Sequence, residues 1–288
     1  MKQFIFVVLA IITALISDAP VLHAASESPQ VIRQKINLSG RQRMLSQRMS
    51  AAACIAMTGL ANGERAMVAQ SAHDEFQNVL NGLRDGDAAL GLPSASSAEV
   101  RAALDTVAAT WTAISPPVQQ LAAGYANVHA IQQIMQTNTD LLRQSNAAVQ
   151  EIVAKYGGSS IAADMAKAID IAGRQRMLSQ RMVKAACFVF VDIGDTDVRG
   201  ELSAAITLFD TSLNDLMNGN LSEGIAAPPS PAVAQQLARV AELWQPFRRQ
   251  LEDMSSGTRA GPDDLLAIAA SGDVVLRESN QAVLRYVD

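Results

Sequence analysis

The sequence predicts an all-α fold made of two tandem up-and-down four-helix bundles. Residues 40–49, with the sequence GRQRMLSQRM, recur unchanged at 173–182, which indicates two copies of one domain. Hydrophobic residues make up 49% of the chain but aromatic residues only 4%. Apolar content carried by Ala, Leu, Val, Ile and Met favours helices over sheets. Breaks at corresponding places divide each copy into four helical stretches with short connections, which is typical of a bundle.

The first 25 residues have the features of a secretory signal peptide. Lys2 precedes an apolar run over residues 4–16, and small residues stand at 24–25, where cleavage is expected. An uncleaved membrane anchor is the alternative, although the run is shorter than the roughly 18 residues that a span needs. No later segment is long and apolar enough to cross a bilayer, so we expect no membrane span in the mature chain and a periplasmic location.

The repeat extends well beyond the identical segment and sets the domain boundaries. Phe76 and Trp111 of the first copy correspond to Phe209 and Trp244 of the second. We therefore predict one four-helix repeat over residues 26–157 and another over 158–288.

Glycine and proline clusters predict where the helices end. Apolar residues between these clusters follow helical spacing, as at Phe76, Leu80 and Leu83. Prolines within the third stretch of each copy are expected to disturb that helix. The expected breaks lie at 62–63, 91–94, 116–124 and 157–158 in the first copy, and at 194–195, 227–231, 246 and 256–262 in the second.

Charge and motif content exclude several classes of function. The net charge of −5 does not favour binding to nucleic acid or to an anionic membrane. The sequence has no paired His/Glu metal motif, nucleophile elbow or phosphate loop. We therefore expect no catalytic residues, no metal ligands and no cofactor, and we predict that the protein is not an enzyme.

The arginines of the repeated segment are the candidate binding residues. On a helix, Arg43 and Gln47 share a polar stripe with Cys54, opposite an apolar face. Residues 40–63 contain no Asp or Glu, so the arginines have no local carboxylate partner. Guanidinium forks without such partners suit a small planar oxyanion, because each fork donates paired hydrogen bonds. The alternative is structural pairing with acids of other helices, such as Asp85, Asp87 or Asp140.

Residues 37–49, with the sequence NLSGRQRMLSQRM, resemble the signature of PilJ-type sensor domains, which are similar to the periplasmic domain of NarX-like nitrate/nitrite sensor kinases. The resemblance implies a four-helix bundle. In nitrate-binding members, the first helices of two subunits hold one nitrate between them. By this resemblance we predict that the arginines and glycines of the repeated segment bind the ligand, and we add the neighbouring glutamines. The predicted ligand-binding residues are Arg43, Arg176, Gly40, Gly173, Gln47, Gln180, Arg48 and Arg181.

The chain departs from that family in supplying two copies without membrane helices. We expect the copies to form an intramolecular pseudo-dimer in which Arg43 and Arg176 converge on one anion, because an isologous interface needs the same patch twice. The predicted function is an exported, soluble sensor or binding protein for a small oxyanion, nitrate or nitrite first. The alternative is a ligand-free helical interaction module that docks onto a membrane chemoreceptor, pilus or transport component.

The two cysteines occupy equivalent positions of the repeats. Cys54 and Cys187 share the stripe of the arginines, and an oxidising compartment permits a disulfide if the two helices pack side by side. The alternative is a pair of small buried residues copied by the duplication.

Overall fold

The computed structural model describes residues 27–125, 127–158, 161–192, 197–256 and 260–288. Within these ranges the chain forms eight α-helices and no β-strand. The helices are α1 (Pro29–Met57), α2 (Asn62–Asp85), α3 (Ala98–Ala122), α4 (Val128–Tyr156), α5 (Ala163–Val191), α6 (Val198–Asn218), α7 (Pro231–Ser255) and α8 (Pro262–Val287). The predicted signal peptide, residues 1–25, lies outside the described residues.

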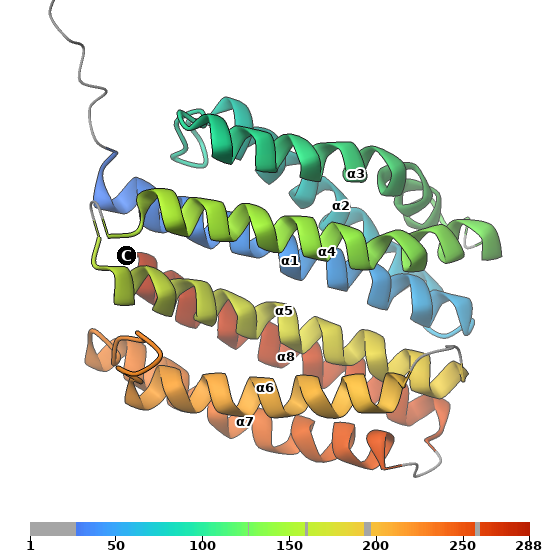
Figure 1. Ribbon diagram of the computed structural model, residues 1–288. Coiled ribbons are helices and arrows are strands. Elements are labelled where there is room, and N and C mark those ends of the chain that lie inside the picture. The colour runs from blue at the N-terminus through green and yellow to red at the C-terminus, as the bar shows by residue number, and fades with distance from the viewer. Residues whose placement is uncertain (1–26, 126, 159–160, 193–196, 257–259) are drawn as a thin grey trace, which may run out of the picture.

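The helices form two up-and-down bundles, as the sequence predicts. Figure 1 shows α1–α4 as one bundle and α5–α8 as the other, with their long axes in a common direction. Helices α1 and α4 of the first bundle face α5 and α8 of the second, and α1 packs along α5. The interface between the bundles is therefore built mainly from the two helices that carry the repeated segment.

Side-chain caps and glycines account for several helix ends. Ser28, Ser97 and Ser230 each accept a hydrogen bond from a backbone N–H in the first turn of the helix that follows. At the other end, Gly86 and Gly219 follow α2 and α6 with φ of 90° and 74°, a conformation that side chains rarely adopt.

The prolines of the third helix in each bundle do not end it. Helix α3 continues through Pro116 and Pro117 to Ala122, and α7 continues through Pro246 to Ser255. The expected break at Pro246 was therefore wrong, whereas α3 does end inside the expected region 116–124. Packing offsets the lost backbone hydrogen bond: Pro117 is buried in the bundle, and Phe247 beside Pro246 packs against Trp244.

Helices α1 and α5 are buried on nearly every side. Each packs against two helices of its own bundle and against the other central helix. Their many alanine, serine and glycine side chains are small enough to allow this close approach, and most of the buried polar side chains donate or accept at least one hydrogen bond. This is why the polar stripe of the repeated segment lies inside the molecule.

None of the helices that the structure describes is both long and apolar enough to cross a membrane.

Candidate functional site

Helices α1 and α5 bring Arg43 and Arg176 together at the centre of the interface. Only 1% of Arg43 and 0% of Arg176 is exposed. A Cβ atom placed on Gly40 would lie 3.3 Å from Nη2 of Arg43 and 3.6 Å from Nη2 of Arg176, and a Cβ on Gly173 would meet the same two atoms at 3.5 and 3.3 Å. The two guanidinium groups therefore converge where both helices carry glycine.

Arg43 is neutralised by a carboxylate from the other repeat. Its Nη2 donates to Oδ1 of Asp170 at 2.6 Å and to the backbone oxygen of Asp170 at 3.2 Å. Its Nη1 donates to Oδ1 of Asn146 on α4, at 3.0 Å. Arg43 thus forms a buried ion pair that joins α1 to α5.

Arg176 makes the same hydrogen bonds to uncharged partners. Its Nη1 donates to Oδ1 of Asn37 and to Oδ1 of Asn280, both at 2.9 Å, and its Nη2 donates to the backbone oxygen of Asn37 at 3.0 Å. No carboxylate among the described residues forms an ion pair with it. Burial, with repulsion by Arg41 and Arg43, lowers the pKa of Arg176 to about 9, so the group stays charged at neutral pH.

Asp170 is ionised in this environment. Burial by itself raises the pKa of its carboxyl group, but the charges of Arg43 and Arg174 and the hydrogen bonds from Arg43 and Gln150 outweigh burial. The pKa of Asp170 therefore lies below its ordinary value. The interface therefore has a carboxylate beside Arg43, from Asp170, and an amide at the equivalent place beside Arg176, from Asn37.

Both arginines retain an unused donor. Their Nε atoms are buried and find no hydrogen-bond acceptor in the part of the chain that the structure describes. A buried N–H without an acceptor is costly, and a small oxyanion beside it would supply the missing acceptor.

Four other predicted ligand residues are engaged in contacts between helices. Gln47 donates from Nε2 to Oδ1 of Asn138, at 3.0 Å. Arg48 donates from Nη1 to Oε1 of Gln180 and also pairs with Asp273, at 3.2 and 2.5 Å.

Nε2 of Gln180 donates weakly to the backbone oxygen of Gly272, at 3.4 Å. Arg181 is half-buried and lies 4.0 Å from Glu201. Direct ligand contacts by Gln47, Arg48, Gln180 and Arg181 stay predictions.

Cys54 and Cys187 are joined by a disulfide. Their Cα atoms are 6.2 Å apart, and both residues are fully buried. The bridge links α1 to α5 about three helical turns beyond the arginines in each repeat, so it fastens the two central helices to each other covalently.

A cleft of about 390 Å³ lies between α1, α2 and α8. Arg41, Arg48 and Arg277 line it, as does Asn280, the residue that accepts a hydrogen bond from Arg176. Arg41 and Arg48 are paired with Glu75 and Asp273 at the same walls. The cleft therefore extends from the surface to Asn280, one of the two described residues that accept hydrogen bonds from Arg176.

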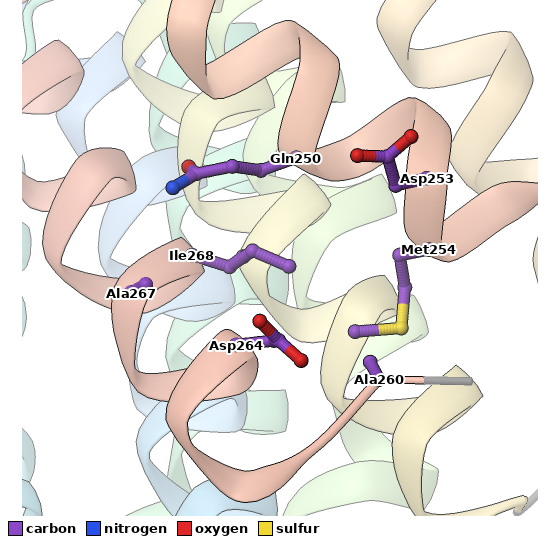
Figure 2. Close-up of a pocket in the computed structure, with 7 residues that line it drawn as sticks. All are labelled: Gln250, Asp253, Met254, Ala260, Asp264, Ala267 and Ile268. Carbon is purple, nitrogen blue, oxygen red and sulfur yellow. The ribbon is translucent and has the colours of Figure 1, made fainter. Parts of the chain in front are cut away.

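A second cavity has the opposite character. It lies between the end of α7 and the start of α8, with a volume of about 150 Å³ (Figure 2). Figure 2 shows the carboxylates of Asp253 and Asp264 together with Gln250, and none of the described residues that line the cavity is basic. Carboxylates repel anions, so this cavity is no candidate for an oxyanion.

Sequence reasoning missed four residues that complete the site. The acids considered as partners, Asp85, Asp87 and Asp140, do not pair with Arg43 or Arg176. The actual partners are Asn37, Asn146, Asp170 and Asn280. A usable signal was present: Asn37 and Asp170 occupy equivalent positions six residues before each arginine, so the change from amide to carboxylate is visible when the copies are aligned.

Comparisons with known proteins place the chain in a sensory family. The family model described as "Type IV pili methyl-accepting chemotaxis transducer N-term" matches residues 32–150 and again 159–268. Methyl-accepting chemotaxis protein McpN of Pseudomonas aeruginosa is 31% identical over 131 residues, which cover 46% of this chain and 23% of that protein. Protein PilJ of the same organism is 24% identical over 214 residues, which cover 74% of this chain and 30% of that protein.

The chain thus matches less than a third of the length of either relative. What it shares with them is the helical sensor module of a chemotaxis transducer, rather than any class of enzyme. Since the family model covers most of the chain in two successive matches, the chain belongs to the PilJ family and carries two tandem copies of its domain.

Proposed function

We propose that the two repeats form one binding site for a small oxyanion, nitrate or nitrite first, in an exported protein that senses or captures it. The observation that carries the proposal is Arg176: a fully buried cation with no carboxylate partner among the described residues, beside a second buried arginine. An isolated buried charge is strongly unfavourable, and a bound anion would neutralise it.

The geometry suits a planar ligand with several oxygen atoms. Each guanidinium is a rigid fork, and each still has a buried Nε–H without an acceptor. Gly40 and Gly173 leave no side chain between the arginines and the helix backbones. A small trigonal oxyanion could accept from both forks, whereas chloride offers one atom and no matching geometry.

An exported protein would need a partner to pass on the signal. We infer a periplasmic location from the predicted signal peptide and from the chemoreceptor relatives, and we infer a membrane receptor or transport component as the partner. Binding would act on the α1–α5 contact, because the ligand would bridge the two bundles there.

A second candidate function is favoured by Asp170. Its carboxylate already occupies Nη2 of Arg43, where a ligand oxygen would otherwise bind. On this view the bundles have lost the ligand and act as an interaction module that docks onto a chemoreceptor or pilus component.

Thermal unfolding with added anions tests the first candidate against the second. Nitrate, nitrite, sulfate and chloride are titrated separately at matched ionic strength, and isothermal titration calorimetry measures each Kd. A ligand that binds only the folded state adds about 2.7 kcal/mol of stability at a hundredfold excess over Kd. We expect nitrate or nitrite to stabilise the protein selectively.

Two variants show whether the arginines are responsible. Arg176→Met removes the unpaired cation without leaving an orphaned acid, and is expected to abolish the selective shift. Arg143→Ala is the matched control, because this arginine lies on the exposed face of α4 and pairs with Asp140. A selective shift that survives Arg176→Met would overturn the proposed site, because the anion would then bind elsewhere. No selective shift with any anion would overturn the proposal and leave the interaction module.

A further inference from the structure

The arginine site is symmetric in shape but not in charge. Asn37 and Asp170 stand at equivalent positions, and each accepts hydrogen bonds from the arginine of the other repeat through its side chain and its backbone oxygen. Both are almost completely buried, with 2% and 5% exposed. The only difference between the two halves at this position is a carboxylate in place of an amide.

This difference sets the net charge of the buried core of the site, which consists of Arg43, Arg176 and their hydrogen-bond partners. Arg43 and Arg176 contribute two positive charges, and Asp170 contributes one negative charge, so one positive charge remains. Arg174 reaches Asp170 only at 3.7 Å from a half-buried position, where water screens it. Arg41 at the cleft is paired with Glu75.

We propose that Asp170 is a built-in counterion that restricts the site to monovalent oxyanions, held mainly by Arg176 and excluding sulfate and hydrogen phosphate dianions. The inference rests on the proposed function, because it concerns the ligand of the same site. A monoanion makes the buried core neutral, whereas a dianion leaves one negative charge buried without a partner, which is strongly unfavourable.

The same carboxylate sets the side on which the anion binds. Nη2 of Arg43 is occupied by Asp170, while Arg176 has only neutral acceptors. The cleft between α1, α2 and α8 reaches Asn280, which contacts Arg176 and not Arg43. Entry and binding are therefore both assigned to the Arg176 side of the pseudo-dimer.

Four forms of the full mature chain test this inference: wild type, Asp170→Asn, Asn37→Asp and the swapped double variant Asn37→Asp/Asp170→Asn. Calorimetry measures Kd for sodium nitrate and sodium sulfate at one ionic strength, and circular dichroism checks folding. Removing the carboxylate is expected to tighten nitrate binding at least about tenfold and sulfate binding more, because a like charge beside a buried ligand weakens binding strongly.

The remaining two variants are matched controls for position. Asn37→Asp places a second carboxylate beside Arg176, leaves no net charge in the core and is expected to abolish nitrate binding. The swapped double variant restores one carboxylate on the opposite half, and we expect its nitrate affinity to return to within about threefold of wild type, a difference below 1 kcal/mol. If Asn37→Asp does not fold, Asp170→Asn alone decides.

The outcomes separate this inference from the proposed function. In one outcome, wild type binds nitrate, and Asp170→Asn has the same nitrate and sulfate affinities as wild type. This outcome overturns the counterion role of Asp170 and leaves the proposed function standing. Binding by neither form overturns both proposals. Binding by Asp170→Asn alone means that the carboxylate replaces the ligand in the natural chain, which also overturns both.

Discussion

Arg43 and Arg176 stand in identical ten-residue segments, on equivalent helices, and both are completely buried. Arg43 is paired with Asp170, whereas Arg176 has three neutral acceptors. The difference arises because each arginine takes its main partner from the other repeat. Asn37 and Asp170 are equivalent positions, so the change from amide to carboxylate alters the charge beside Arg43 but not beside Arg176. In a duplicated domain, the same residue at the same position of both copies can therefore have two different electrostatic environments.

The largest expected effect comes from truncating each arginine in the absence of anions. Arg43→Met leaves Asp170 buried without its main partner, and should lower the free energy of unfolding by about 3–5 kcal/mol. Arg176→Met removes a buried cation that has no acid partner but leaves its three neutral acceptors without a donor, so it should cost less, about 1–3 kcal/mol. Urea unfolding followed by circular dichroism measures both values.

A double variant controls for lost packing at Arg43. Arg43→Met/Asp170→Asn removes both members of the ion pair, so most of the loss should be recovered relative to Arg43→Met alone. Equal losses for Arg43→Met and Arg176→Met would contradict the comparison, since they would mean that charge pairing does not distinguish the two sites.

The disulfide is a contact that both halves share equally. Reducing it should lower the free energy of unfolding by about 2–4 kcal/mol, because Cys54 and Cys187 close a long loop in the unfolded chain. Cys54→Ser, Cys187→Ser and the double variant should lose similar amounts, in contrast to the unequal arginine variants. Urea midpoints with and without a phosphine reductant test this, and an unchanged midpoint on reduction would refute it.

The sequence was sufficient to predict the fold but not the depth of burial of the arginines. Helical spacing, glycine breaks and the repeat led to two four-helix bundles, which the structure confirms. In the sequence the stripe of Arg43 is a polar face opposite an apolar one, and in the structure the other central helix covers it. Periodicity within one helix distinguishes polar from apolar faces, but it does not reveal what a second helix places against a polar face.

The partners of the arginines were harder to predict because they come from distant parts of the chain. Asp170 reaches Arg43 across 127 positions, and Asn280 reaches Arg176 across 104. The acids that the sequence suggests as partners lie in the same repeat, where Asp85 and Asp140 instead pair with surface arginines. Only a three-dimensional arrangement of the two copies places the carboxylate of one beside the arginine of the other.

A second difference between the repeats lies along the same interface. Asn138 on α4 donates from Nδ2 to the backbone oxygen of Ser46, at 2.7 Å, and accepts from Gln47 and Lys184. The corresponding position on α8 is Gly272, beside Gln180. In the first bundle the side chain of Asn138 fills the space at this position. In the second bundle the side chain of Val183 on α5 lies where a side chain at Gly272 would be.

The smallest predicted effect tests that difference. A Cβ at Gly272 would overlap Cγ2 of Val183 and lie 3.4 Å from the ring of Phe247. Overpacking typically costs about 1–3 kcal/mol, against a gain of up to about 1 kcal/mol in helix propensity, so Gly272→Ala should lose about 1–2 kcal/mol. Gly63→Ala, at an exposed position of α2 with nothing near its Cβ, is the matched control and should be neutral or stabilising.

Adding Val183→Ala to Gly272→Ala removes the overlapping methyl groups and should recover part of the loss, since the two changes share one space. Urea unfolding of wild type, the single variants Gly272→Ala and Val183→Ala, and the double variant measures the coupling. If Gly272→Ala is as stable as wild type, helix α8 can move away from α5 at this point, and the close packing that holds Arg176 against Asn280 would not depend on the glycine.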